Sequence, residues 1–151
     1  MIIMADDLSG PQIADFLAEH VRQMRSLTPA ESVHALDLEE LRAPDTTFWS
    51  VLDGQALVGC GAIKDLRGGH AELKSMRVRP ERRRSGIASQ LLARIITEAR
   101  GAGFTRLSLE TGAVAFFHPA RKLYEKSGFS FCEPFADYHP DPHSVFMTRE
   151  L

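Results

Sequence analysis

The stretch that most constrains this chain runs from Met76 to Ser89. It begins in a run of β-forming residues, passes through a turn that Pro80 initiates, and continues after Gly86 into a segment with helical periodicity. A strand, a glycine-containing turn and a helix N-terminus bring unpaired backbone amides and the positive end of the helix dipole to one point. Three consecutive arginines, residues 82–84, add positive charge. The stretch therefore predicts a site for the pyrophosphate of a nucleotide-like cofactor.

The distribution of charge supports a compact anionic ligand. The net charge is −2, yet the segment from Lys74 to Arg84 carries +5, which leaves −7 for the rest. A long nucleic acid needs an extended basic face instead. No apolar run approaches the roughly 20 residues that span a bilayer, and an N-terminus with Asp6 and Asp7 is unlike a signal peptide. We expect a cytoplasmic protein without nucleic-acid or membrane partners.

Hydrophobic periodicity predicts one mixed α/β domain over residues 1–151. Helices are expected after Pro11, after Pro29, after Gly86 and over residues 119–127, and the strands over residues 1–4, 46–52, 55–66, 70–78, 105–111, 129–133 and 144–149. The three strands between residues 46 and 78 are expected to form an antiparallel meander. Thr28 and Glu31 predict a capping box for the second helix, and Asp37 is expected to cap a separate last turn.

Two motifs and the order of the elements resemble the GNAT superfamily of N-acetyltransferases. Arg83-x-x-Gly86-x-Ala88 matches the acyl-CoA signature of that family, and Ala120-x-x-Leu123-Tyr124-x-x-x-Gly128-Phe129 matches its late helix and the following strand. The resemblance implies a mixed α/β (α+β) fold. Its central, mostly antiparallel sheet would have about six to seven strands, would splay at the fourth strand, and would be flanked by about four helices.

The resemblance also implies acetyl-CoA as the cofactor. Pantetheine would pair with the backbone where the fourth strand splays, often at a β-bulge, and the pyrophosphate would lie on the amides of the turn. Gly86 lacks the side chain that would keep the diphosphate from the backbone. Family members often have Asn where this chain has Phe117, so Phe117 is expected to pack against the cofactor arm. The implied cofactor contacts are Met76, Arg77, Val78, Arg83, Arg84, Ser85, Gly86, Ile87, Ala88, Ser89, Phe117 and Tyr124.

Tyr124 matches the usual general acid of the family. A phenol with a pKa of about 10 can protonate the departing thiolate of coenzyme A or hydrogen-bond its sulfur. The alternative is a core tyrosine on an amphipathic helix.

Glu72 matches a strand position where some family members have their general base. An ammonium with a pKa near 10 must lose a proton before it attacks a thioester, and a partly desolvated carboxylate can accept it. The alternative for Glu72 is a surface carboxylate paired with Lys74 or Arg77. Glu110, on the next strand, is the rival base, ahead of His118.

Several polar residues are candidates for the acceptor site. Arg25 and His34 flank the loop between the first two helices, which borders the acceptor site in this family, and either side chain can bind a substrate carboxylate. Asp137 and Tyr138 lie in a late loop where Asp137, His139, Asp141 and His143 alternate. Such a set could bind a metal, but the interleaved prolines indicate a stiff irregular loop. We expect the rim of an acceptor cleft and no metal.

The sequence therefore predicts an acetyl-CoA-dependent N-acetyltransferase. The expected acceptor is the amine of a small or amino-acid-like molecule that attacks the thioester directly in a ternary complex. The alternatives are acetylation of a protein or peptide amine and a non-catalytic acyl-CoA sensor. The sequence does not specify the acceptor, because a fold carries many specificities. An exposed last strand or helix could mediate a homodimer.

Overall fold

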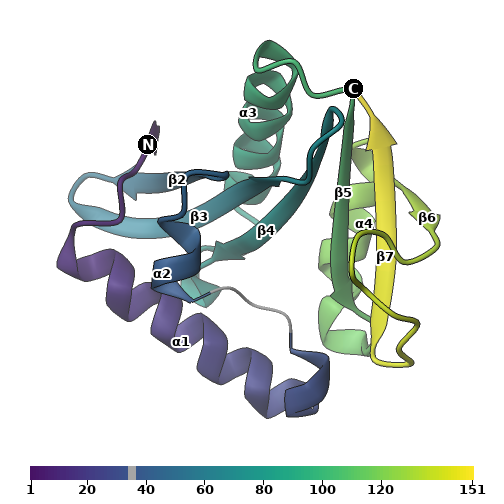
Figure 1. Ribbon diagram of the computed structural model, residues 1–151. Helices are drawn as coiled ribbons and strands as arrows, with labels where there is room; N and C mark the ends of the chain where they lie inside the picture. Colours follow the sequence, from purple (N-terminus) through teal and green to yellow (C-terminus); the bar gives the residue numbers. More distant parts are fainter. Residues whose placement is uncertain (34–36) are drawn as a thin grey trace.

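The computed structural model describes residues 1–33 and 37–151. Across these residues a seven-stranded sheet has the order β1-β2-β3-β4-β5-β7-β6 (Figure 1). The elements in chain order are β1 (Ile2–Ala5), α1 (Pro11–Leu27), the 3-10 helix η1 (Ala30–Ser32), α2 (Leu38–Leu41), β2 (Thr46–Asp53), β3 (Ala56–Asp65), β4 (His70–Val78), the 3-10 helix η2 (Pro80–Arg82), α3 (Ile87–Gly101), β5 (Arg106–Gly112), the 3-10 helix η3 (Ala115–Phe117), α4 (His118–Lys126), β6 (Ser130–Cys132) and β7 (Ser144–Glu150).

The sheet is antiparallel except where β4 meets β5. Strands β2, β3 and β4 form the predicted meander. Strands β4 and β5 run parallel and pair only from His70 to Leu73 and from Arg106 to Leu109. Beyond Leu73 the two strands diverge, as Figure 1 shows. The predicted mixed fold, splayed at the fourth strand, is confirmed.

A β-bulge lies in β4 at the point of divergence. Cys60 pairs with Arg77 and Ala62 pairs with Lys74, so β4 contains one more residue than β3 between these pairs. Ser75 has a φ of 57°, a left-handed conformation that residues other than glycine seldom adopt. The Cys60 thiol donates a hydrogen bond to the Ser75 carbonyl at 3.2 Å. The bulge bends β4 away from β5 and so widens the gap between them.

Helices cover both faces of the sheet (Figure 1). On one face Phe16 and Leu17 of α1 and Leu41 of α2 pack against β2 and β3. On the other face α3 presents a wholly buried stripe, with Leu91, Leu92 and Ile95 at 0% exposure. These apolar positions recur at helical spacing, which is why the chain forms helices here. None of the described helices is both long and apolar enough to cross a membrane.

The second helix differs from its sequence prediction. Residues Ala30–Ser32 form a single 3-10 turn whose N-cap is Pro29, and no side chain caps it among the described residues. The predicted Thr28 capping box is therefore wrong. Asp37 does cap α2, and it forms a reciprocal capping box with Glu40. The η1 turn instead ends at Ser32, which is buried at the edge of the cleft described next.

Candidate active site

A cavity of about 600 Å³ follows the gap between β4 and β5. Its walls come from α1, the bulged part of β4, the turn before α3, β5, α4 and the loop before β7. The predicted site residues that line it are Glu72, Met76, Arg77, Val78, Arg83, Arg84, Gly86, Ile87, Ala88, Ser89, Glu110, Phe117, Tyr124 and Tyr138. Ser85, Arg25 and Asp137 are exposed and do not line it, and His34 lies outside the described residues.

One end of the cavity is a turn that fits a pyrophosphate. Arg84 and Gly86 have φ angles of 62° and 84°, and Gly86 is the N-cap of α3. No side chain of the described residues caps this helix, so its first amides remain available to a ligand. A methyl group added at Gly86 would approach only Gln90, at 3.8 Å. The backbone is therefore open to a diphosphate, although the positive φ favours glycine.

The three arginines of the turn have different partners. Arg82 forms an ion pair with Asp53 in the β2–β3 turn, at 2.5 Å between Nη1 and Oδ2. The guanidinium of Arg83 lies 5.3 Å from the centre of the Phe116 ring. Arg84 is exposed. Arg83 and Arg84 thus retain charge to offer a phosphate, whereas the charge of Arg82 is largely offset.

The middle of the cavity offers strand backbone and an aromatic wall. Past Leu73 the β5-facing edge of β4 has no strand partner among the described residues, so the backbone of Met76 and Val78 remains available to an extended amide ligand. Phe117 packs so closely on Gly112 that a methyl group added there would lie 2.1 Å from the ring. Phe117 lines the cavity at the junction of η3 and α4.

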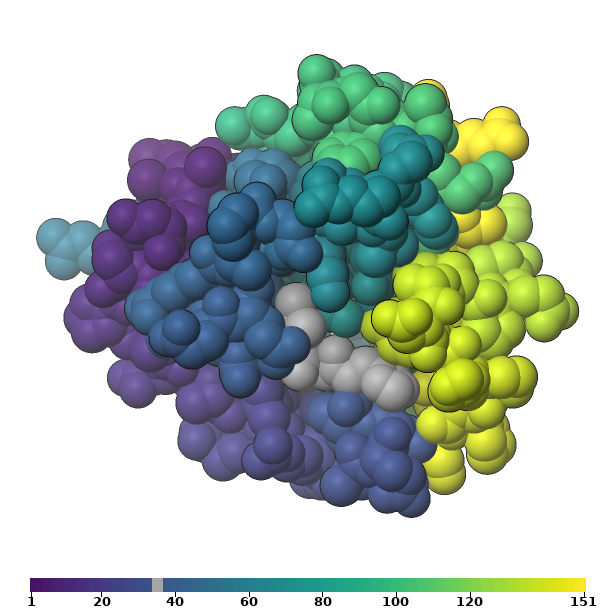
Figure 2. All heavy atoms as spheres, in the orientation of Figure 1, coloured from purple at the N-terminus to yellow at the C-terminus, as the bar shows by residue number. Residues whose placement is uncertain are grey.

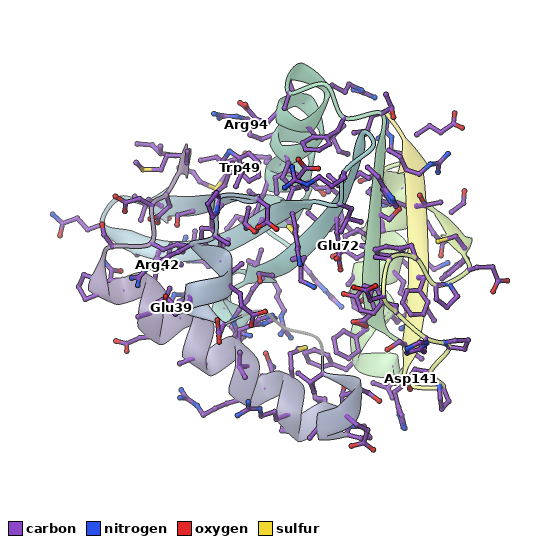
Figure 3. The ribbon with its side chains drawn as sticks, in the orientation of Figure 1. Glu39, Arg42, Trp49, Glu72, Arg94 and Asp141 are labelled. Atoms are coloured by element: carbon purple, nitrogen blue, oxygen red, sulfur yellow. The ribbon has the colours of Figure 1, made fainter. Side chains whose placement is uncertain are left out.

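Glu72 belongs to a buried three-residue cluster. Glu72 is 4% exposed. Its carboxylate accepts hydrogen bonds from Lys74 Nζ at 3.1 Å and from the Tyr138 hydroxyl. Lys74 also donates to the Tyr138 hydroxyl at 3.0 Å. Figure 3 shows Glu72 on the side of β4 that faces β5. Burial and the neighbouring Glu72 raise the pKa of Tyr138. The sequence offered Lys74 or Arg77 as the partner of Glu72, and the structure pairs Glu72 with Lys74.

Glu110 on β5 and Tyr124 on α4 both line the cavity. Burial raises the pKa of the Glu110 carboxyl to about 7, and the Lys74 ammonium opposes this rise. Burial, followed by the charge of Glu110, raises the pKa of Tyr124 above its ordinary value. The Tyr124 ring also packs against Phe129, with centroids 5.8 Å apart. At neutral pH the phenol therefore retains its proton, and the carboxyl is divided between its two forms.

The η1 turn and the loop before β7 are joined by a contact that the sequence did not predict. Ser32 of η1 donates a hydrogen bond to Asp141 Oδ2 at 2.5 Å, across 109 positions of the chain. In the space-filling view the blue segment around η1 meets the yellow-green loop before β7 at the lower edge of the molecule (Figure 2). Figure 3 labels Asp141 in this part of the loop before β7. No spacing in the sequence signals such a contact.

The late loop does not gather metal ligands within the described part of the chain. No group of three or more His, Cys, Asp or Glu side chains there could hold a metal ion. Asp141 accepts a hydrogen bond from the backbone amide of His143 at 2.8 Å and so stabilises the turn before β7.

A glycine-containing turn at a helix N-terminus, a bulged strand and a splayed parallel pair together fit an acyl-CoA-dependent acyltransferase. A family model described as "Acetyltransferase (GNAT) family" matches residues 13–129. The chain belongs to this family. It is an acyl-CoA-dependent N-acetyltransferase, and its cofactor is acetyl-CoA.

Two curated relatives and two solved structures are similar to the chain. A Bacillus subtilis (strain 168) protein described as uncharacterized N-acetyltransferase YsnE is 54% identical, and the match covers 100% of both chains. An "IAA acetyltransferase" of Azospirillum brasilense is 44% identical over 92% of this chain and 90% of its own. A Klebsiella pneumoniae protein proposed to be an acyl-CoA N-acyltransferase has a TM-score of 0.84 at 29% identity, over 99% of this chain and 97% of its own.

The second solved structure shows only that the fold is shared with this chain. It is an aminoglycoside 6'-N-acetyltransferase in complex with coenzyme A, at 19% identity and a TM-score of 0.74, over 99% of this chain and 97% of its own.

Proposed function

We propose that this protein acetylates the amine of a small molecule, by direct attack of the amine on the thioester of acetyl-CoA in a ternary complex. In this mechanism Glu110 is the general base and Tyr124 the general acid. The observation that carries the proposal is the pairing of a carboxyl group whose pKa is about 7 with a buried, protonated phenol in one cleft. Acetyl-CoA supplies the activated acetyl group.

A small acceptor is favoured by the attachment of the loop before β7. Residues 134–143 are attached at two points, because Tyr138 bonds to Glu72 and Lys74 while Asp141 bonds to Ser32. These contacts join the loop to β4 and to η1, and Tyr138 and Ser32 both line the cavity. A peptide acceptor needs a groove that is open at both ends, so this arrangement favours a small molecule.

Glu110 is a stronger candidate for the base than Glu72. A base is most effective when its pKa is near the working pH, because it is then both deprotonated and sufficiently basic. Glu110 has such a pKa. Glu72 Oε2 is already bonded to both Lys74 and Tyr138. We therefore assign Glu72 to positioning Tyr138 and Lys74, and assign proton transfer to Glu110.

Tyr124 is suited to protonate the leaving thiolate. It is 6% exposed and lies on α4, at the side of the cavity where Phe117 and Ala120 contribute to the wall. Its raised pKa keeps the proton on the phenol until a thiolate forms nearby. A backbone N–H near Val78 is the candidate donor to the developing oxyanion.

The test is an acetyl-CoA-dependent screen that measures thiol release and the mass of the product. The panel contains amino acids, polyamines, aminoglycosides and short peptides. We expect acetylation of a small amine and a fall in kcat of about tenfold or more in Tyr124→Phe, with little change in the Kd of acetyl-CoA. Tight acetyl-CoA binding with no turnover on any amine would contradict catalysis. Faster turnover of peptides than of single amines would contradict a small acceptor.

A further inference from the structure

The cavity wall contains two buried polar groups that the proposed mechanism does not use. Arg77 on β4 and His20 on α1 are each 9% exposed, and both line the cavity. Arg77 Nε and His20 Nδ1 have no hydrogen-bond partner among the described residues. A buried donor without a partner is costly, on the order of 1–3 kcal/mol and more when charged, so such groups in a cleft are expected to have a ligand.

We infer that the acceptor is an amino carboxylate whose carboxylate binds to Arg77 and His20 while its amine faces Glu110. This inference rests on the proposed function, since it concerns the other end of the same acceptor. A carboxylate accepts hydrogen bonds only and can bridge two donors. A guanidinium is the side chain whose geometry matches it best.

The charge of Arg77 is weakly compensated by the protein. Its Nη1 donates to the neutral Gln23 amide at 2.5 Å. The carboxylate that pairs with it, Glu19, is 4.0 Å from Nη2, and the Glu19 side chain is 54% exposed. Solvent screens a pair of this kind. A ligand carboxylate in the cavity would therefore meet a cation whose charge is still available.

His20 contributes a donor without a second charge. Burial and the nearby Arg77 lower the pKa of His20 to about 4, so the imidazole is neutral at pH 7. A neutral imidazole has one N–H group, and the tautomer with this proton on Nδ1 can donate to a ligand oxygen. The α1 side of the cavity therefore offers a single positive charge and two unused donors.

The cavity wall also contains groups of complementary character. The charge of Glu72 is matched by Lys74 at 3.1 Å, which leaves Glu110 to receive a proton from an amine. The wall thus contains a cation on β4 and a base on β5. An amine without a carboxylate would fill only half of this arrangement. The sequence suggested Arg25 for the carboxylate, but Arg25 is exposed and outside the cavity lining.

The experiment compares each amino acid in the acceptor panel with its own carboxamide. The carboxamide keeps the side chain and the amine but removes the charge. We expect kcat/KM to be about tenfold or more higher for the carboxylate, which corresponds to a charge-assisted hydrogen bond. The carboxamide amine is the less basic of the two and is more often unprotonated at neutral pH, so this difference works against the expected result.

Variants then locate the carboxylate site. In Arg77→Met the ratio of the two kcat/KM values should fall to about 1, while Arg77→Lys should keep part of it. The control is Arg22→Met, which removes an exposed arginine from the same helix as His20. Because the ratio compares two acceptors on one enzyme preparation, partial misfolding cancels. His20→Phe should lower the same ratio and serves as the second variant if Arg77→Met does not fold.

The outcomes separate the two proposals. Equal rates for amino acids and carboxamides would overturn the carboxylate site and leave the acetyltransferase mechanism intact. A preserved ratio in both Arg77→Met and His20→Phe would show that the carboxylate binds elsewhere, and would also overturn the inference. The absence of acetylation on every amine would overturn both proposals.

Discussion

The two ends of the cleft are built in different ways. At the cofactor end the ligand-facing groups are mostly backbone amides, held by the bulge at Ser75 and the left-handed residues Arg84 and Gly86. At the acceptor end they are side chains that come from α1, η1, β4, β5 and the loop before β7. Contacts made by the backbone do not depend on the side chains, so all members of a family can bind the same cofactor in this way. Side chains from distant segments can be replaced one at a time, so we expect the proposed acceptor end to set the specificity.

The largest expected effect comes from removing the proposed base at the acceptor end. In Glu110→Gln we expect kcat to fall by about 100-fold, because general-base catalysis is typically worth at least this much. The Kd of acetyl-CoA should change little. In the wild-type protein kcat should rise with pH through about 7 and then level off, because only the deprotonated Glu110 is active.

The pH profile of the variant is the decisive measurement. Glu110→Gln should lose the inflection near pH 7, and the exposed Glu133→Gln should keep it and serve as the control. If Glu72→Gln abolishes the inflection while Glu110→Gln retains it, the assignment of the base must be exchanged.

An intermediate effect is expected at the cofactor end, where glycine should matter more than charge. Gly86→Val places a β-branched residue at a φ of 84° and should raise the KM for acetyl-CoA by about tenfold, equivalent to roughly 1.4 kcal/mol. Arg82→Met should change it by about twofold or less, because Arg82 is half-exposed and paired with Asp53. Both variants should leave the KM for the acceptor unchanged. The reverse ranking would mean that the arginines carry the pyrophosphate contact.

The smallest effect is expected from releasing the loop before β7 from η1. Ser32→Ala removes the hydrogen bond to Asp141 and should raise the kcat/KM of longer acceptors relative to short ones by about fivefold, equivalent to roughly 1 kcal/mol. Ser26→Ala is the matched control, because Ser26 is exposed and bonds within its own helix, to the Gln23 carbonyl. An unchanged length preference would show that this contact does not limit acceptor size.

The same contrast explains what the sequence could predict. The meander and the helix after Gly86 are encoded by short-range patterns, and each was predicted with nearly its observed bounds. The false capping box at Thr28 shows the limit of such patterns, because Thr28 and Glu31 have the right spacing while the backbone follows Pro29. The cap at Asp37 was predicted correctly, whereas its reciprocal box with Glu40 was not predicted.

The acceptor end was only partly predictable. Glu72 and Tyr138 were identified separately, but their contact spans 66 positions, and no local rule joins residues so far apart. Ser32 carried no signal, since an isolated serine is ordinary in a turn. His20 lies on the apolar face of α1, where a histidine in the sequence resembles any other core residue.

The single parallel pair in the described sheet has a consequence for the electrostatics of the cofactor end. Because β4 and β5 run in the same direction, both strands finish at the same end of the sheet. The helices that follow, α3 and α4, therefore begin near the open end of the cleft. Each helix presents its N-terminus, which carries about half a positive charge. An antiparallel pair would turn one of these dipoles around, so strand direction alone contributes to the attraction of an anionic cofactor.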